Sequence, residues 1–480
     1  MQTLRRAWAR EWACGISTRE AIIIAALVCL AAFTFFWRLG EGSLFECDEA
    51  RHAQEAREMI WHRDLLTPHW DGVPRLTKPP LHFWQTIAAF KVFGDNEFAA
   101  RFPSALASVG AVLMTYLLGR ALFDRATGLG AALLLLVVRN HPYSYYYNFV
   151  SVGRMSMLTA PLAFYALAAI WLAWRGEKDR RYLIFIGLPV GAAAMTKNVA
   201  SLMPAASLVL YWLLTRKLRD WPWRELALAL ALFAAIALPW HVAQALAHTE
   251  TFVQEYVLFN VVQRVTADID ESFRSYSTWF HLDTIRKGFS YLWPALPLAA
   301  LLAGYRALAR RERAPLLLLT WALVPVAAYT AAQTKLPWYV LEAYPPLALL
   351  AAWLLVRVPG RPWGLALIVA FMVAFGWRVP SPRDDAPLIK RVAGAVPYLA
   401  GKDDMVLICM ANDDYTRPTS LYYARRPLQY VDARNMDNLL RARAGARFLL
   451  TDTSVWPASG LQGEIVCQAG KHLLVRFAGP

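Results

Sequence analysis

The sequence predicts an α-helical protein that crosses a membrane many times and ends in a small α/β domain. Hydrophobic residues occupy 57% of the 480 positions, charged residues occupy 18%, and the mean hydropathy is +0.32. Apolar runs of roughly 15 to 20 residues, long enough to cross a bilayer as helices, recur along the chain. Examples are 21–37, 226–240, 314–332 and 339–356. After Pro380 these long runs give way to shorter alternating segments.

Basic residues gather in the short connectors between apolar runs, and they predict the orientation. The net charge is +15, but it is spread over these connectors and does not indicate nucleic-acid binding. The clusters are Arg5, Arg6, Arg10 and Arg19; Arg175, Lys178, Arg180 and Arg181; Arg216, Lys217, Arg219 and Arg224; Arg306, Arg310, Arg311 and Arg313. Short basic loops stay in the cytoplasm. Placing every cluster there predicts about eleven membrane helices, with the N-terminus inside and the C-terminus outside. The first run lacks an A-x-A-like cleavage site, so it is expected to be retained.

The same assignment predicts a membrane domain over residues 1–380 and an outer α/β domain over residues 381–480. It places the segments 38–102 and 241–287 on the outer face. A shorter outer loop, 139–154, contains the aromatic run YSYYY, which we interpret as an interfacial aromatic belt.

The last hundred residues alternate between expected strands and helices. Strands are expected at MVLICM, LQYVD, RFLLTD and EIVCQA, and helices at PLIKRVAGAVPYL, PTSLYYARR and MDNLLRARA. This alternation is typical of an α/β module. The segment contains no glycine fingerprint and no nucleophile elbow, so we expect a supporting role. Cys409 and Cys467 could form a disulfide in this outer position or remain as two buried thiols.

Charges are concentrated directly after the first apolar run, in CDEARHAQEAREM (residues 47–59). If Asp48 begins a helix, Arg51, Glu55 and Glu58 follow at spacings of three and four and share one face. Small apolar residues occupy the other side. This pattern predicts an amphipathic helix on the outer membrane surface, with its polar side toward solvent. The helix dipole should keep Asp48 ionised.

The next segment adds cations near this acid. Lys78 precedes two prolines, which hold an extended turn and cannot continue a helix. A lysine fixed at the bilayer surface, with Arg51 and Arg75 nearby in sequence, could bind a lipid phosphate. Together, these residues predict an anion site next to a carboxylate.

Three motifs resemble a known family. CDEARHAQEAREM, TKPPLHFW and FGDNEFAARFPSAL are similar to the bacterial aminoarabinose lipid A transferases and to the wider protein mannosyltransferase superfamily, which are membrane glycosyltransferases of the GT-C fold. Weaker matches are LFDRATG, MTKNVA, LPW at 238–240, VVQR at 261–264 and KLPWYVLEAYPPLALLAA. The resemblance covers most of residues 20–355, whereas the C-terminal domain fits by position.

The resemblance implies roles for individual residues. Asp48, the acid that opens the DEAR motif, would be the catalytic carboxylate. Arg51, Lys78, Arg264 and Tyr339 would bind the phosphate of a polyprenyl phosphate sugar donor. Glu49 and His82 are candidates for supporting roles.

Two departures from the family pattern change what we expect. Many relatives have a glutamate before the KPP motif, implicated in zinc binding, whereas this chain has Thr77. A hydroxyl is a poor substitute for a carboxylate ligand, so the sequence predicts no metal and no cofactor, with His82 and His281 as hydrogen-bond partners. Many relatives also have an aspartate where this chain has Ser156, and no acid occurs from Arg139 to Ser156.

The expected function is transfer of a sugar from a polyprenyl (undecaprenyl) phosphate donor to lipid A or another glycolipid, at the outer face of a bacterial inner membrane. The alternatives are a protein O-glycosyltransferase and a non-catalytic or lipid-transporting relative. Charges gathered at one membrane face, without an obvious internal repeat, favour an enzyme over a transporter. The expected partners are the donor, a lipid or protein acceptor and membrane lipids. Asp48 could serve a hydroxyl acceptor as a general base, whereas a phosphate acceptor would need only orientation, and both remain open.

Overall fold

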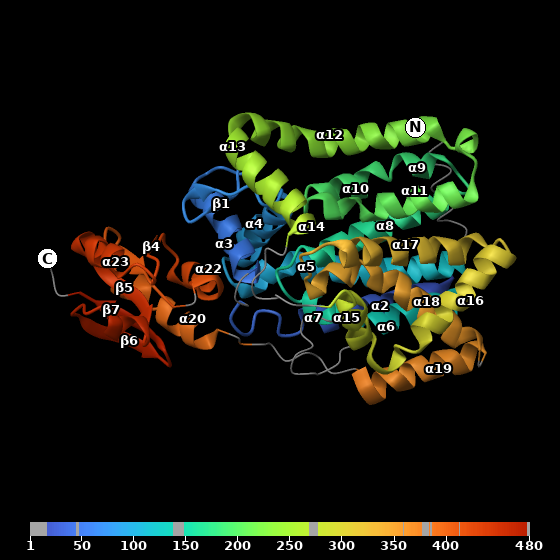
Figure 1. Cartoon of the computed structure of the whole chain (residues 1–480). Coiled ribbons are helices and arrows are strands. Elements are labelled where there is room, and N and C mark those ends of the chain that lie inside the picture. Colours follow the sequence, from blue (N-terminus) through green and yellow to red (C-terminus); the bar gives the residue numbers. More distant parts are fainter. Residues whose placement is uncertain are drawn as a thin grey trace.

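The computed structural model describes residues 17–44, 48–137, 148–267, 277–358, 360–376, 384, 386–411 and 413–477. The aromatic run YSYYY lies outside the described residues. Most of the described chain is helical, and Figure 1 shows a long helical bundle, a small C-terminal domain, and a group of short elements between them.

The bundle contains most of the helices. They are α2 (Thr18–Phe36), α5 (Glu97–Leu122), α6 (Arg125–Leu135), α7 (Phe149–Gly153), α8 (Thr159–Gly176), α9 (Arg181–Ile184), α10 (Gly187–Ala194), η1 (Val199–Leu202), α11 (Met203–Thr215), η2 (Leu218–Asp220), α12 (Trp223–Ala247), α13 (Thr249–Thr251), η3 (Phe252–Gln263), α14 (Arg264–Thr266), α15 (Phe280–Phe289), η5 (Ser290–Leu292), α16 (Ala295–Ala309), α17 (Arg313–Ala331), η6 (Pro337–Ala343), α18 (Tyr344–Arg357), α19 (Arg361–Phe371) and η7 (Met372–Gly376).

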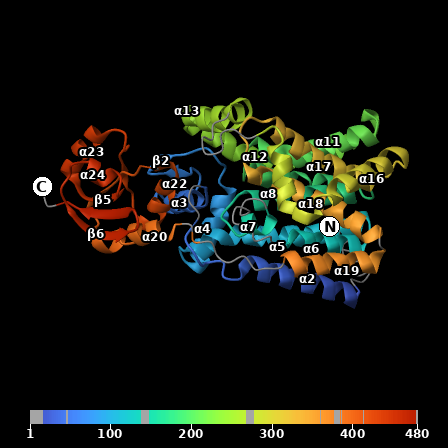
Figure 2. The ribbon, with the colours of Figure 1, turned by 60° about the horizontal axis from the view of Figure 1, so that its bottom comes forward.

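Apolar composition and local caps explain these helices. The Asn96 side chain accepts a hydrogen bond from the Ala99 amide at the start of α5, and Asp124 accepts one from the Thr127 amide at the start of α6. The two helices lie side by side (Figure 2). They approach so closely at Gly119 and Gly128 that a Cβ on Gly119 would lie 2.6 Å from the Gly128 Cα. A residue larger than glycine at either position would therefore push α5 and α6 apart.

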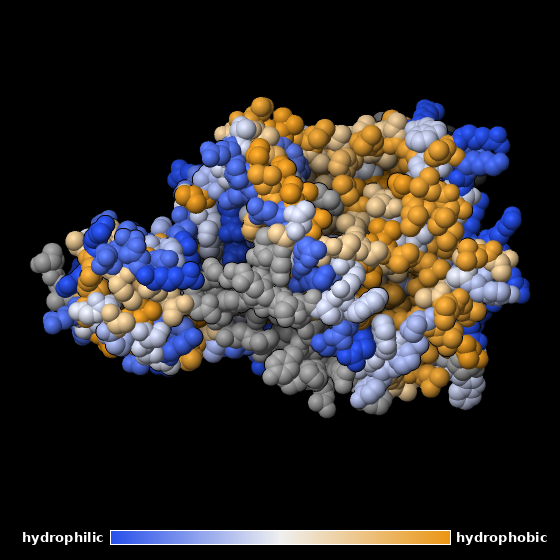
Figure 3. Space-filling model, in the orientation of Figure 1, coloured by the Kyte–Doolittle hydropathy of each residue, from blue (hydrophilic) through white to orange (hydrophobic). Residues whose placement is uncertain are grey.

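The bundle is a polytopic membrane domain. Within the described residues, five helices are long and apolar enough to span a membrane, or six if the α15–α16 pair, bent by 100°, counts as one span. Four shorter apolar helices accompany them. Figure 3 shows hydrophobic side chains covering the bundle. Hydrophilic side chains gather at the end of the bundle farthest from the C-terminal domain and over the C-terminal domain itself. The predicted polytopic fold is confirmed, whereas the number of about eleven spans and the orientation stay predictions.

The C-terminal domain is an α/β module, as the sequence predicts. Its elements are α20 (Pro387–Ala393), α21 (Val396–Leu399), β3 (Met405–Ile408), α22 (Asp413–Ala424), β4 (Gln429–Tyr430), α23 (Met436–Ala442), η8 (Arg443–Gly445), β5 (Ala446–Asp452), α24 (Val455–Ala458), β6 (Glu464–Ala469) and β7 (His472–Arg476). The described strands form a sheet in the order β4-β3-β5-β7-β6. Strand β7 was not predicted. The domain boundary near residue 380 stays a prediction, because residues 377–383 lie outside the described part.

Alternation along the strands places helices on both faces of this sheet. Ile408 and Leu450 pack with α20 and α22 on one face, while Leu407 and Leu449 pack with α23 on the other. Cys409 is buried, Cys467 is partly buried, and no disulfide joins them. Of the two alternatives, the structure therefore has the one without a disulfide.

The segment between the two bodies contains α3 (Asp48–Trp61), β1 (His69–Trp70), β2 (Val73–Pro74) and α4 (Leu81–Phe93). Helix α3 begins at Asp48, as expected, but its polar side does not face solvent. Glu49, Glu55, Arg57 and Glu58 are each at most 3% exposed. The prediction of a solvated surface helix is therefore wrong, because one polar face of α3 borders a cavity and the other meets the C-terminal domain (Figure 1).

Candidate active site

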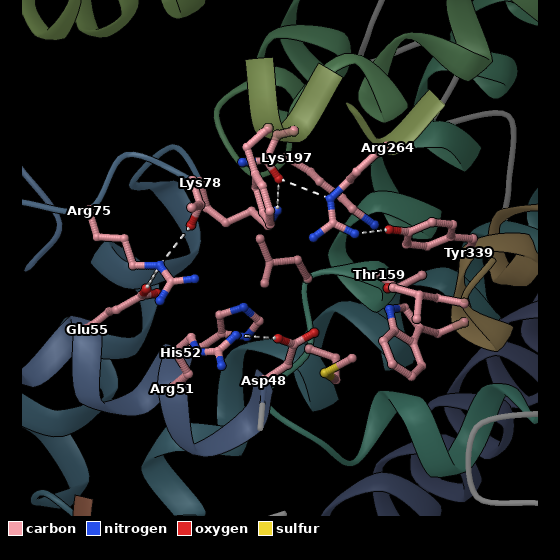
Figure 4. Close-up of a pocket in the computed structure, with 17 residues that line it drawn as sticks. Asp48, Arg51, His52, Glu55, Arg75, Lys78, Thr159, Lys197, Arg264 and Tyr339 are labelled. Atoms are coloured by element: carbon pink, nitrogen blue, oxygen red, sulfur yellow. Dashed lines mark hydrogen bonds and ion pairs between the residues drawn. The ribbon is translucent and has the colours of Figure 1, made fainter. Parts of the chain in front are cut away.

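A cavity of about 580 Å³ lies where α3, the turn before α4, the η3–α14 segment and η6 converge (Figure 4). Its polar lining consists of Asp48, Arg51, His52, Glu55, Arg75, Thr77, Lys78, Thr159, Lys197, Asn260, Arg264 and Tyr339. Met157, Leu158, Phe259, Leu336 and Trp338 supply its apolar walls. The cavity therefore unites Asp48, Arg51, Lys78, Arg264 and Tyr339, although nearly three hundred positions separate the first from the last.

Backbone hydrogen bonds fix the turn that presents Lys78. The amide of Leu76 donates to the Glu255 carboxylate at 2.6 Å, and the amide of Leu81 donates to the Met195 carbonyl at 3.0 Å. Prolines 79 and 80 have no amide hydrogen to donate, and the chain between these two anchors bends at Thr77 and Lys78 before α4 begins. As a result, the Lys78 side chain enters the cavity from a fixed backbone.

Asn260 brings two cations together at one side of the cavity. Its Oδ1 accepts from the Lys78 Nζ at 3.0 Å and from the Arg264 Nε at 3.3 Å. The Arg264 Nη1 donates to the Tyr339 hydroxyl at 2.7 Å. The remaining donors on both cations can approach a shared anion, as phosphate-binding sites require. Asn260 was not among the predicted residues, since nothing in VVQR indicates an amide one turn before Arg264.

Lys197 is a further cation in this group that the sequence analysis missed. Its Nζ lies 4.6 Å from the centre of the Tyr339 ring, and the side chain is buried. Lys197 belongs to MTKNVA, one of the weaker motif matches, but the resemblance assigned no role to this lysine. Figure 4 shows Lys78, Lys197 and Arg264 converging on the same side of the cavity.

Positive charge exceeds negative charge in the cavity lining. Five basic side chains (Arg51, Arg75, Lys78, Lys197 and Arg264) face two carboxylates (Asp48 and Glu55). Burial and the neighbouring Arg264 and Lys197 hold the pKa of Lys78 well below its usual range. A bound anion would stabilise the charged lysine, because buried like charges are costly without a counter-charge.

Asp48 remains ionised in this setting. Burial alone would raise its pKa, but His52, Arg51, Lys78 and Arg264 outweigh burial and lower the pKa to about 2. The contact from the Arg51 Nη1 to the Asp48 Oδ1 is long, at 3.4 Å. Asp48 is therefore a carboxylate at any physiological pH, as predicted, but it is the neighbouring charged groups that lower its pKa.

Glu55 and Arg75 form a second ionic contact at the far side of the cavity (Figure 4). The Arg75 Nε lies 3.3 Å from the Glu55 Oε1 and also donates to the Thr77 hydroxyl at 3.2 Å. Burial raises the pKa of Glu55 to about 7, and Arg75 offsets part of that effect. Thr77, which takes the position of the glutamate expected from the family, therefore serves as a partner for Arg75.

Glu49 and His82 lie behind the cavity wall and do not line it. The Glu49 Oε1 accepts from the Arg101 Nε at 2.8 Å and from the Ser156 amide at 3.0 Å. The His82 Nε2 lies 3.4 Å from the Ser156 hydroxyl. Both residues thus fix the segment around Ser156, where many relatives have an aspartate.

Among the residues that the structure describes, no group of three or more histidines, cysteines, aspartates or glutamates could hold a metal ion. Thr77 offers a hydroxyl to Arg75, and His281 does not line the cavity. A metal-free site stays a prediction.

Comparisons with known proteins find related sequences and a shared fold. Residues 77–240 match the family model described as dolichyl-phosphate-mannose-protein mannosyltransferase. The undecaprenyl phosphate-alpha-4-amino-4-deoxy-L-arabinose arabinosyl transferase 2 of Pseudomonas fluorescens is 31% identical over 351 residues, 70% of this chain and 57% of the relative. The Sodalis glossinidius protein of the same name is 30% identical over 349 residues, 70% of this chain and 60% of the relative.

Solved structures share the fold over almost the whole chain. ArnT from Cupriavidus metallidurans, in a crystal structure bound to undecaprenyl phosphate, gives a TM-score of 0.76 at 20% identity, covering 95% of this chain and 99% of that one. The chain therefore has the GT-C fold. A more distant GT-C structure, the apo oligosaccharyltransferase of Archaeoglobus fulgidus, gives a TM-score of 0.56 at 12% identity, with 90% and 69% of the two chains covered. By sequence, this GT-C chain spans about 57% of the length of the first arabinosyl transferase it matches.

Proposed function

We propose that this chain transfers a sugar from a polyprenyl phosphate donor, such as an undecaprenyl phosphate sugar, to lipid A or another envelope glycolipid. The observation that carries the proposal is the cluster of Lys78, Lys197 and Arg264 around Asn260 and Tyr339, beside the ionised Asp48. The cluster holds more positive than negative charge and borders the apolar walls of a membrane protein. A lipid phosphate satisfies both features at once, because its head is anionic and its tail is apolar.

The chemistry of the transfer follows from this placement. When the bond between the sugar and the phosphate breaks, negative charge develops on the departing lipid phosphate. Lys78, Lys197 and Arg264 are fixed where that charge forms, so they stabilise the leaving group. With the phosphate on these cations, the sugar extends toward Asp48 on the floor of the cavity. The carboxylate there can stabilise positive charge on the sugar carbon or act on the incoming acceptor.

Turnover by purified protein tests the proposal. Protein in lipid nanodiscs would receive a polyprenyl phosphate sugar with a radiolabelled sugar, together with lipid A. Appearance of label in the acceptor, with release of polyprenyl phosphate, is the expected result. Tight donor binding without any transfer would instead favour the non-catalytic or lipid-transporting alternative, and label on co-purified polypeptide would favour protein glycosylation.

The location of the reaction is part of the proposal. The basic connectors favour an outer location for the cavity and the C-terminal domain, on the periplasmic side of the inner membrane. Reporter fusions at Asp220 and at Lys402 should therefore report opposite sides, with Asp220 in the cytoplasm. If both fusions reported the cytoplasm, the predicted orientation and the outer location of the cavity would fail together.

A further inference from the structure

His52 lines the cavity and is not among the residues proposed above to hold the donor phosphate. It lies one helical turn after Asp48 on the same face of α3, and its side chain is 5% exposed. Figure 4 shows its ring next to Asp48 and Arg51, at the floor of the cavity. It is therefore an imidazole in a cavity whose charged lining consists of five basic side chains and two carboxylates.

The hydrogen bonds of His52 define its tautomer. The Nδ1 lies 2.9 Å from the carbonyl oxygen of Ser156. A carbonyl oxygen can only accept, so Nδ1 must carry the hydrogen and donate it. In a neutral ring, the lone pair that can accept a proton is then on Nε2.

The Ser156 carbonyl is itself held in place. The Ser156 amide donates to Glu49, which also accepts from the buried Arg101, and the Ser156 hydroxyl lies beside His82. The ring of His52 is thus oriented by a rigid group behind it. Orientation of an imidazole by a fixed acceptor at Nδ1 is what makes Nε2 a directed base.

Electrostatics keep the ring neutral. The charged and titratable groups around it are Asp48 and Arg51 on its own helix, Lys78 on the turn before α4, and His82 on α4. Burial lowers the pKa of His52 to about 4; Asp48 raises it in part, and Lys78 and Arg51 lower it further. Since Asp48 has a pKa of about 2, the imidazole is the more basic member of the pair. A proton released next to Asp48 and His52 is therefore accepted by the imidazole ring of His52.

We propose that His52 Nε2 accepts the proton of an acceptor hydroxyl group during sugar transfer, and that Asp48 stabilises the imidazolium that forms. This inference rests on the proposed function and deepens it, because it assigns the acceptor to the class of hydroxyl-bearing lipids. A phosphate dianion has no proton to give and would not need this base.

The step balances without a further reactant. The acceptor O–H bond breaks, and its proton moves to the His52 Nε2. The oxygen forms a new bond to the anomeric carbon as the bond from that carbon to the phosphate oxygen breaks. The electron pair of the broken bond leaves on the polyprenyl phosphate, held by Lys78 and Arg264, and the imidazolium then returns its proton to solvent.

His52→Asn is the variant that isolates the base. The asparagine amide nitrogen can donate to the Ser156 carbonyl in place of Nδ1, but nothing replaces Nε2. Transfer to a hydroxyl acceptor should fall by about 10²- to 10⁴-fold in kcat, the usual range for loss of a general base. Affinity for undecaprenyl phosphate should remain unchanged. His241→Gln is the control, since the His241 ring bonds to Ala237 and Tyr256, does not line the cavity, and should leave kcat within a few-fold of the parent.

Chemical rescue separates a base from a structural residue. In His52→Ala, added imidazole should restore part of the turnover, and the rescue should follow the concentration of its neutral form. Near-normal hydroxyl transfer by His52→Asn would overturn the proposal. Loss of undecaprenyl phosphate binding in both variants would make His52 a structural residue and would overturn it as well.

The acceptor class is tested with two synthetic glycolipids that differ only in a hydroxyl or a phosphate monoester at the receiving position. Label should reach the hydroxyl acceptor in the wild-type chain. Transfer to the phosphate acceptor alone would overturn the role of His52 while leaving the proposed glycosyl transfer intact. Transfer to neither acceptor would remove the proposed function itself, and this inference with it.

Discussion

The two polar faces of α3 carry the same kinds of charged residue but hold them differently. The cavity face consists of Asp48, Arg51, His52 and Glu55. Its ionic contacts are long, 3.4 Å between Asp48 and Arg51 and 3.3 Å between Glu55 and Arg75. At these distances the groups attract one another electrostatically without a well-formed hydrogen bond.

The docking face consists of Gln54, Arg57 and Glu58, and its contacts are short. Arg57 binds both carboxylate oxygens of Asp95, at 2.7 and 2.8 Å, and donates to the Tyr422 carbonyl of the C-terminal domain. Its guanidinium also lies 4.0 Å from the centre of the Tyr422 ring. Glu58 accepts from the amides of Asp71 and Gly72, each at 3.0 Å, and Asp71 pairs with Arg417 of the C-terminal domain.

The difference shows how one helix can be both rigid and reactive. Short bidentate contacts on the docking face saturate the donors there and fix the position of the helix. The longer ionic contacts on the cavity face hold Asp48 and Glu55 less tightly, so these two carboxylates can turn toward a ligand at a smaller cost. A site of this kind needs such a rigid support, since small displacements of catalytic groups lower the rate steeply.

Asp48→Asn should have the largest effect and tests the cavity face directly. The amide keeps the shape of the side chain but removes its charge, so turnover should fall by about 10³-fold or more. Affinity for undecaprenyl phosphate should largely survive, because the cations remain. Single-turnover transfer and equilibrium lipid binding would be measured on the same preparation, with the exposed Glu41→Gln as a control. Near-normal turnover would leave the cavity face without a catalytic centre.

Arg57→Met should have the next largest effect and tests the docking face. Removing a buried guanidinium leaves Asp95 and the Tyr422 carbonyl without their partner, which should weaken docking of the C-terminal domain by about 2 to 4 kcal/mol. Hydrogen exchange over α22 should rise, and kcat should fall as α3 loosens. Arg425→Met is the matched control, since its contact with the Asp95 carbonyl is exposed and should matter by less than about 1 kcal/mol. Faster exchange with unchanged kcat would show that docking does not position the cavity face.

Lys78→Ala should weaken donor binding by about 10- to 100-fold, the loss expected for one charge-assisted contact to a phosphate in a partly desolvated site. Turnover at saturating donor should change less than affinity does. Titration with a polyprenyl phosphate sugar would measure the effect, and the exposed Lys91→Ala on the neighbouring helix is the control. Unchanged affinity would place the phosphate elsewhere in the cavity.

Glu55 should give the smallest effect, seen in the pH dependence. Its pKa of about 7 means that the side chain is neutral at lower pH and adds a negative charge to the cavity at higher pH. Donor affinity should therefore fall by about three- to tenfold as the pH rises through 7. The donor is a phosphodiester whose own charge does not change there. Glu55→Gln should remove the step, and a step that persisted in this variant would have to come from another group.

Sequence reasoning found the residues that belong to motifs and missed those whose role depends on burial. Asp48, Arg51, Lys78, Arg264 and Tyr339 carry local signatures, so their meeting in one cavity could be expected from the resemblance. Asn260 and Lys197 could be assigned to the site only from the fold. An asparagine near an arginine, or a lysine between apolar helices, occurs in many structural settings and does not by itself indicate a binding site.

The exposure of α3 could not be read from its own residues. Helical spacing identifies which positions share a face, but it does not say whether that face meets solvent or protein. Here the partner of Arg57 is Tyr422, which lies 365 positions later. Strand β7 was missed for a related reason, because HLLVR becomes a strand through pairing with β5 and β6.

The docking of α3 on the C-terminal domain also has a consequence for how the protein is made. Helix α3 leaves the ribosome early, whereas Tyr422, its docking partner, is translated 365 positions later. At about 5 to 20 residues per second, that interval is roughly 20 to 70 seconds. During this interval, Arg57 of α3 lacks the Tyr422 carbonyl, which is its hydrogen-bond partner in the C-terminal domain. A chain that has not yet reached Tyr422 therefore lacks this contact, and the docking face of α3 is complete only after the C-terminal domain has been made.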